Sequence, residues 1–281
     1  MTLDIDHLAS WIGNTETMEE VLSPQLVRRF NATLGMDAST NVGDPAPLMI
    51  HFCLAQPALP EDQLGPDGHP RRGGFLPPVP LPRRMWAGGE ITFEAPLMIG
   101  GTITRSSTIQ NVEQKTGNSG ALCFVTVQHD ISCDGKPALR EHHNIVYRDP
   151  PADGADQAAA PAAKPAPVGL HSHMVETTPT MLFRYSAMTF NGHRIHYDAP
   201  HAREVEGYDG LVVHGPVQAT LMAHMAARTR GRIPARFSYR GKSPLFVGTP
   251  FRVNGAETDD GMSLWTAASG GPIAMQAQAS W

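Results

Sequence analysis

Two segments of the chain repeat each other, and this repeat constrains the fold. The segment APLMIGGTI at 95–103 resembles SPLFVGTPF at 243–251, and the prolines and the glycines of the two copies each lie 148 positions apart. Each copy follows an aromatic residue, Phe93 or Phe237, and precedes strand-like sequence. Similar segments at one constant spacing indicate an internal duplication. We therefore expect the 281 residues to form two copies of one fold that pack as a pseudo-dimer.

Each copy has a helical part followed by strands. Residues 2–34 carry apolar positions spaced by three and four, which predicts helix, and 47–57 occupies the place of a central helix. From 90 to 148, Val, Ile, Thr and Phe alternate with polar residues between Gly- and Asn-containing turns. This pattern is typical of antiparallel strands. Shorter runs of the same kind follow residue 236, so the expected class is α+β, with two antiparallel sheets each wrapped around a central helix.

Two stretches rich in proline or glycine interrupt this plan. Residues 150–170 have no apolar periodicity and are interpreted as an Ala/Pro linker between an N-terminal half, 1–149, and a C-terminal half, 171–281. Residues 59–89 contain interleaved Phe, Leu, Val and Trp, which favours an ordered loop that covers a groove.

Composition excludes several functions. A net charge of −5 and a pI near 6.2 give no electrostatic case for nucleic acid binding. The three cysteines lack CxxC spacing, which argues against disulfides and zinc clusters, and we expect small buried thiols in a reducing cytoplasm. No apolar run approaches a membrane span, and the N-terminus lacks signal-peptide features. The pairs His142-His143 and His171/His173 lack a third ligand at metal spacing, so no metal is expected.

A motif in the second half carries the candidate chemistry. The sequence SAMTFNGHRIHYD at 186–198 is followed by LVVHGPVQATLMAH at 211–224. Pro216 stands at a plausible first helical position, and apolar residues at i, i+4 and i+8 continue to a glycine stop at Gly231. The N-terminus of such a helix offers unpaired N–H groups, and Gly215 lets an oxyanion approach them.

The order of these parts resembles the MaoC-like hydratase/dehydratase family of the hotdog fold. That family has an acidic residue, a histidine five positions later and a His-Gly step that opens a central helix. Here Asn191 stands at the acidic position, His196 matches the histidine and His214-Gly215 matches the helix entry. The segments FNGHRIHYD and VEGYDGLVVHGP resemble those of the mesaconyl-C4-CoA (3-methylfumaryl-CoA) hydratases and the type 2 hydroxyacyl-thioester dehydratases. No histidine follows Thr33 at the matching spacing, so the first copy is expected to be non-catalytic.

The resemblance implies that water is added to the double bond of an enoyl thioester. His196 is the expected base because imidazole titrates near neutrality, and the Gly215 N–H is the candidate oxyanion donor. Asn191 can hold the water but cannot accept its proton. Asp198 either orients His196 from an extended segment or serves a structural role.

Substrate binding is assigned mainly to arginines, because a CoA ester brings phosphates and the resemblance adds a distal carboxylate. The expected substrate-binding residues are Arg194, Arg83, Arg84, Trp86, Arg240 and His214, although Arg83 and Arg84 also fit a solvated strand edge.

The expected reaction is hydration of mesaconyl-C4-CoA to citramalyl-CoA. The alternatives are an itaconyl-CoA hydratase, a 3-hydroxyacyl-thioester dehydratase, an acyl-CoA thioesterase or a non-catalytic acyl-CoA-binding subunit. No cofactor is implied, since the thioester itself acidifies the α-proton. We expect a CoA thioester as the ligand and no nucleic acid or membrane partner. The oligomeric state is left open, with a homodimer as one alternative.

Overall fold

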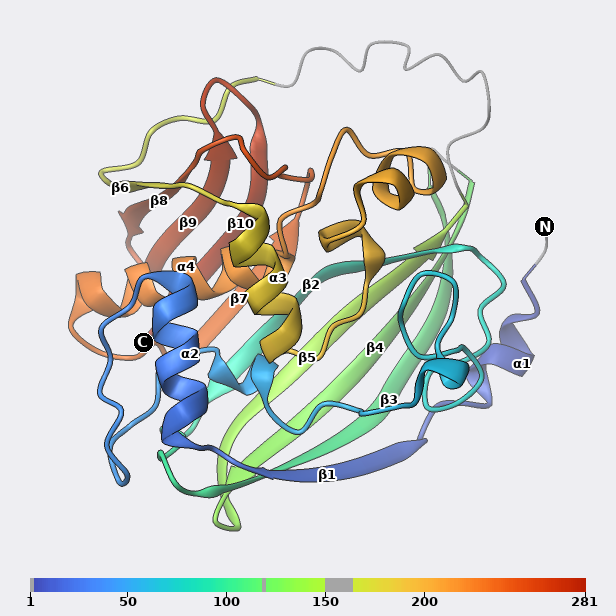
Figure 1. Ribbon diagram of the computed structural model, residues 1–281, viewed down its shortest axis with the longest axis horizontal. Helices are drawn as coiled ribbons and strands as arrows, with labels where there is room; N and C mark the ends of the chain where they lie inside the picture. The colour runs from blue at the N-terminus through green and yellow to red at the C-terminus, as the bar shows by residue number, and fades with distance from the viewer. Residues whose placement is uncertain (1–2, 118–119, 150–163) are drawn as a thin grey trace.

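The strands form a single antiparallel sheet in the order β1-β3-β4-β5-β2-β7-β10-β9-β8-β6, as the computed structural model in Figure 1 shows for residues 3–117, 120–149 and 164–281. The strands of the first half are β1 (Thr15–Val21), β2 (Arg83–Phe93), β3 (Thr102–Gly117), β4 (Gly120–Cys133) and β5 (Lys136–Arg148). Those of the second half are β6 (His171–Val175), β7 (Arg236–Gly241), β8 (Phe251–Thr258), β9 (Gly261–Ala268) and β10 (Ile273–Ser280).

The strand order shows the duplication. Each half runs from an outer strand through a three-stranded meander to a strand at the seam, where β2 of the first half pairs with β7 of the second. Gly89 lies opposite Tyr239 at this seam, and a Cβ on Gly89 would come 2.5 Å from the Tyr239 hydroxyl oxygen. The repeat glycines Gly100 and Gly248 have φ of 92° and 85°, so both turn the chain in the left-handed region before β3 and β8.

The two halves also share a capped helix. The main helices are α1 (Ile5–Ala9), α2 (Pro24–Leu34), α3 (Pro179–Met188) and α4 (Gly215–Arg230). α2 and α3 lie side by side in front of the sheet (Figure 1). Each begins with proline, and the hydroxyls of Ser23 and Thr178 accept from the N–H groups of Leu26 and Met181 at 3.2 and 3.1 Å.

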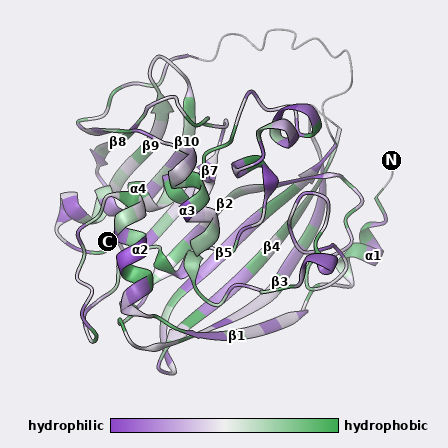
Figure 2. Cartoon of the chain, in the orientation of Figure 1, coloured by the Kyte–Doolittle hydropathy of each residue, from purple (hydrophilic) through white to green (hydrophobic). Residues whose placement is uncertain are grey.

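The central helix α4 lies in the core rather than at its surface. The expected stripe of Val217, Leu221 and Met225 is buried, but Ala219 and Ala223 are buried as well. α4 is therefore enclosed on most sides and is not amphipathic. The strands show the alternation expected for one buried face, and Figure 2 shows it as bands of opposite hydropathy along β3 and β4.

Three expectations about the first half are wrong in part. Residues 2–34 are not helical throughout, because β1 separates α1 from α2 and pairs with β3. Residues 47–57 form only a 3₁₀ helix, η1 (Ile50–Cys53), so this half lacks a long central helix. The cover loop ends at residue 82, because 83–89 belong to β2; the loop contains a 3₁₀ helix, η2 (Glu61–Gln63).

The boundary between the halves is described only in part. Most of the expected linker, 150–163, lies outside the described residues, and 164–170 run without helix or strand onto the second half, where Trp265 Nε1 donates to the Pro167 carbonyl at 2.9 Å. The three cysteines, Cys53, Cys123 and Cys133, are buried and free, as expected. In the described part of the chain, no helix is long and apolar enough to cross a membrane.

Candidate active site

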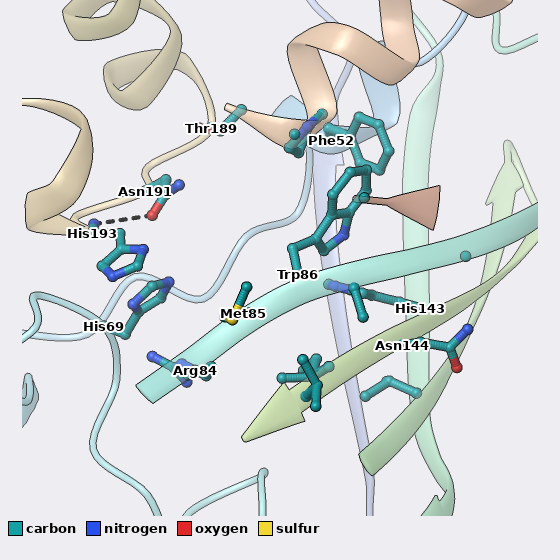
Figure 3. Close-up of a pocket in the computed structure, with 18 of the residues that line it drawn as sticks. Phe52, His69, Arg84, Met85, Trp86, His143, Asn144, Thr189, Asn191 and His193 are labelled. Carbon is teal, nitrogen blue, oxygen red and sulfur yellow. Dashed lines mark hydrogen bonds between the residues drawn. The ribbon is translucent and has the colours of Figure 1, made fainter. Parts of the chain in front are cut away.

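A groove of about 1890 Å³ runs along the seam between the halves. β2 forms its floor with Arg84, Met85 and Trp86, and the cover loop contributes His69. The second half contributes the segment after α3 and the start of α4, so the motif residues Asn191, His196 and Gly215 all line the groove. Figure 3 shows side chains from both halves pointing into it.

His196 has the geometry of a neutral base. It ends the 3₁₀ helix η3 (Arg194–His196) and is buried, with Nδ1 2.7 Å from the carbonyl oxygen of Val212. Because a carbonyl only accepts, Nδ1 carries the proton and Nε2 keeps its lone pair. Burial lowers the pKa of His196 to about 4, against an opposing effect of the bond to Val212. The imidazole is therefore uncharged at neutral pH.

His214 packs against His196 and is itself held in place. The two rings stack with centroids 3.6 Å apart, and Nε2 of His214 lies 2.8 Å from Oγ of Ser186 on α3. Burial, and then the neighbouring His196 and His193, lower the pKa of His214 well below its ordinary value. Its Nδ1 is buried and has no hydrogen-bond partner among the described residues. This arrangement makes His214 a neutral ring that fixes the position of His196.

Asn191 and Asp198 have different surroundings. The carbonyl oxygen of the Asn191 side chain accepts from the His193 N–H at 3.0 Å, which leaves the amide NH₂ as its free end. The expected extended segment around Asp198 is absent, since 194–196 are helical. The Asp198 carboxylate instead accepts from the Arg194 guanidinium at 2.7 Å and from the His201 N–H at 3.1 Å, where the π-helix η4 (His201–Val205) begins. These contacts favour the structural role of Asp198.

Gly215 is the first residue of α4, so its N–H has no acceptor within the helix. A Cβ at this position would come 2.4 Å from Cε3 of Trp86. Trp86 in turn stacks on Tyr239, with centroids 4.6 Å apart. Glycine is therefore required where the helix start meets the tryptophan at the seam.

The four candidate arginines are used differently. Arg194 is bound to Asp198 and to the carbonyl of Pro66, and Arg83 lies 3.6 Å from Glu206. Arg240 lies exposed on β7 at the groove. Arg84 points into the groove (Figure 3), and its side chain is only 8% exposed.

Sequence reasoning missed residues that come from distant segments. Asp67 and His69 of the cover loop meet His193, and their ligand-type atoms lie within 4.8 Å of one another. His143 was expected at the surface or on an edge strand, but it lies half-buried beside Trp86 on the inner strand β5, and desolvation lowers its pKa to about 4. No local pattern could reveal these neighbours, because the seam pairing and the folding of the loop bring them together.

The chain also resembles proteins of known activity. Residues 49–247 match the family model "Hydroxyacyl-thioester dehydratase type 2". The chain is 41% identical over 275 residues, 95% of each chain, to the mesaconyl-C(4)-CoA hydratase of Chloroflexus aurantiacus.

Solved structures support the fold. A MaoC-like dehydratase of Phytophthora capsici matches over 99% of each chain, with a TM-score of 0.71 and 14% identity. A Mycobacterium tuberculosis protein described as a double hotdog fold has a TM-score of 0.58 and 13% identity, over 96% of this chain and 95% of that one. The double hotdog fold is thus confirmed, and the relatives with named activities are hydratases and dehydratases, which are carbon–oxygen lyases. The chain belongs to the hydroxyacyl-thioester dehydratase type 2 family.

Proposed function

We propose that the protein hydrates mesaconyl-C4-CoA to citramalyl-CoA by adding water to the β-carbon of the enoyl thioester. The observation that carries this proposal is the 41% identity, over nearly all of both chains, to a mesaconyl-C(4)-CoA hydratase. The groove, which is lined by a neutral imidazole and by the start of a helix, supports the same chemistry.

His196 acts as the base in this proposal. Nε2 takes a proton from water as the water oxygen bonds to the β-carbon, and the Val212 carbonyl stabilises the imidazolium through Nδ1. The imidazolium then returns the proton to the α-carbon, so the addition needs no external acid. Its low pKa makes the imidazolium a strong acid, which favours protonation of carbon.

The N–H of Gly215 stabilises the enolate oxygen that forms between these two steps. It has no acceptor within α4, and the helix dipole places positive potential at the same point. Asn191 contributes hydrogen bonds from its NH₂ end and no base function, because its oxygen is already bound to the His193 N–H.

A CoA thioester is the proposed ligand, with Arg240 at the groove as a contact for its phosphates. Location in the cytoplasm and a homodimer remain predictions. Fractionation of the native host and the molar mass of the purified chain in solution would test these two points.

Assays with purified protein test the function. The single chain should remove the conjugated absorbance of mesaconyl-C4-CoA faster than that of itaconyl-CoA or crotonyl-CoA, without an added partner. Lack of turnover on every enoyl thioester would overturn the proposal, and release of free thiol would indicate a thioesterase instead.

A second candidate is the reverse reaction on a 3-hydroxyacyl thioester. The match to the type 2 dehydratase family model over 49–247 favours it. The two activities use the same proton transfers, so the preferred acyl group distinguishes them. Higher kcat/KM for an uncharged 3-hydroxyacyl thioester than for citramalyl-CoA would favour the dehydratase.

A further inference from the structure

Nε of the Arg84 guanidinium is buried and has no hydrogen-bond partner among the described residues. The Arg84 side chain is only 8% exposed. Its nearest carboxylate oxygen, Oδ2 of Asp67, lies 3.6 Å from Nη2. A buried N–H donor without an acceptor is unfavourable, because burial removes the water that would solvate it. A guanidinium in a groove therefore indicates an anionic ligand.

Two imidazole rings lie beside this charge. The rings of His69 and His193 lie 4.3 Å apart, and Figure 3 shows both near Arg84. Nδ1 of His69 is buried and has no hydrogen-bond partner among the described residues. Burial lowers the pKa of His193 to about 3, so this ring is neutral and can donate one hydrogen bond. Arg84, His69 and His193 thus offer one positive charge and additional donors, beside the carboxylate of Asp67.

The same residues could instead bind a cation, since Asp67, His69 and His193 provide a carboxylate and two imidazoles. Arg84 argues against this, because its guanidinium lies 3.6 Å from the carboxylate that would bind the metal. Asp67 already has another role, as its Oδ1 accepts from the backbone N–H of His69 at 3.1 Å. It orients the loop histidine beside the arginine.

The position of this set relative to His196 identifies the part of the substrate that it would bind. The rings of His193 and His196 are 5.6 Å apart and perpendicular. In a monothioester of a C4 dicarboxylic acid, the free carboxylate is attached directly to the carbon that takes up water. A carboxylate held beside His193 would therefore place that carbon next to the proposed base.

We propose that Arg84, His69 and His193 form the subsite that binds the free carboxylate of a dicarboxylic acid monothioester. This inference rests on the proposed function and adds the residues that select its substrate. It assigns the distal carboxylate to Arg84 in place of Arg194, whose guanidinium is already bound to Asp198. Neutralising the carboxylate also makes the β-carbon more electrophilic, so Arg84 serves turnover as well as binding.

The experiment compares two matched pairs of ligands. Succinyl-CoA and butyryl-CoA are saturated, so they bind without reacting. They differ only in a terminal carboxylate or methyl group, so the ratio of their dissociation constants measures the contribution of the carboxylate subsite to binding. Mesaconyl-C4-CoA and crotonyl-CoA report turnover. The variants are Arg84→Met and His69→Ala, with Arg140→Met as the control, because Arg140 forms a half-exposed ion pair with Asp130 on another part of the sheet. Circular dichroism verifies that each variant is folded.

Arg84→Met should weaken succinyl-CoA binding by about 10- to 100-fold, the range for a charge-assisted hydrogen-bonded pair, and leave butyryl-CoA binding within about threefold. His69→Ala should show the same selectivity with a smaller loss, and Arg140→Met should match the wild type. On mesaconyl-C4-CoA, Arg84→Met should lower kcat and raise KM. Equal losses on both members of a pair would overturn the inference.

Two further results separate this inference from its alternatives. If the wild-type protein hydrates no enoyl thioester but still prefers succinyl-CoA in an Arg84-dependent manner, the proposed function fails and the carboxylate subsite stands. Titration with zinc chloride tests the metal alternative. One zinc bound per chain that is lost in His69→Ala, together with unchanged succinyl-CoA binding in Arg84→Met, would replace the anion site by a metal site.

Discussion

The imidazole rings of His196 and His214 stack at a centroid distance of 3.6 Å with their planes 18° apart. Both rings are buried and neutral, and each has one nitrogen within hydrogen-bonding distance of a fixed group: the Val212 carbonyl for His196 and the Ser186 hydroxyl for His214. Stacking and these two bonds hold His196 in one orientation. The proposed base is therefore positioned before the substrate binds, which is the condition for efficient proton transfer.

His196→Ala should lower kcat by at least about 100-fold, because it removes the general base. Asn191→Ala should lower kcat by only about tenfold, which corresponds to the loss of one hydrogen bond to a positioned water. Steady-state kinetics on variants shown to be folded provide the comparison. Near-normal turnover of His196→Ala, or a larger loss for Asn191→Ala, would refute the assigned roles.

Gly215→Ala should disturb the start of α4, because the added Cβ would come 2.4 Å from the Trp86 ring. We expect a loss of about 1–3 kcal/mol in the free energy of unfolding, together with reduced kcat. The double variant Gly215→Ala with Trp86→Leu removes the clash and should recover part of the stability lost by Gly215→Ala. An unchanged Tm for Gly215→Ala would mean that the tryptophan moves freely and that glycine is not required for packing.

Acid should destabilise the fold between about pH 6.5 and pH 3. Burial lowers the pKa values of His143 and His196 to about 4 and that of His193 to about 3. In the unfolded chain these groups take up protons at a pKa near 6.5, before they do so in the folded protein. The free energy of unfolding therefore falls as the pH drops through this window, and it has its full value above the window. Each group accounts for on the order of 3–5 kcal/mol.

Urea unfolding at several pH values measures this effect. His193→Gln removes one of the three groups, so its stability should depend less steeply on pH than that of the wild type. Equal slopes would show that His193 does not titrate on unfolding as its burial implies.

Tyr239→Phe should weaken the junction of the two halves. The Tyr239 hydroxyl on β7 donates to the buried Oε1 of Glu141 on β5 at 2.6 Å, across the intervening strand β2. Without this donor the carboxylate loses a hydrogen bond in the core, which should lower the free energy of unfolding by about 1–3 kcal/mol. Tyr197→Phe is the matched control, because the Tyr197 hydroxyl bonds the Gly192 carbonyl at the surface, and its loss should stay below about 1 kcal/mol.

The motif and the internal duplication could both be predicted from local sequence. His196, Gly215 and the start of α4 lie within one short stretch, and the left-handed glycines Gly100 and Gly248 mark equivalent turns of the two copies. Such features depend on residues that are close together in the sequence and on local backbone conformation. They can therefore be recognised from one sequence.

The helical expectation for residues 15–21 failed because pairing decided the structure there. Glu16 and Glu20 give this segment no distinctive strand character, but its backbone bonds to β3 along the outer edge of the sheet. Local propensity is a weak preference that such tertiary contacts override. The shortened helix at 47–57 is similar: Met49 and Ala55, on either side of η1, have positive φ, which is incompatible with a continuous helix.

The sequence alone determined which residue types could perform the chemistry: one histidine, one amide and one helix start within a single motif. The tertiary structure decided what surrounds them. Arg84, His69 and His193 lie on a strand, a loop and a separate half of the chain, and only the seam between β2 and β7 and the folded cover loop bring them together. Contacts between residues more than a hundred positions apart leave no periodic trace in one sequence, because each partner satisfies only its own local pattern.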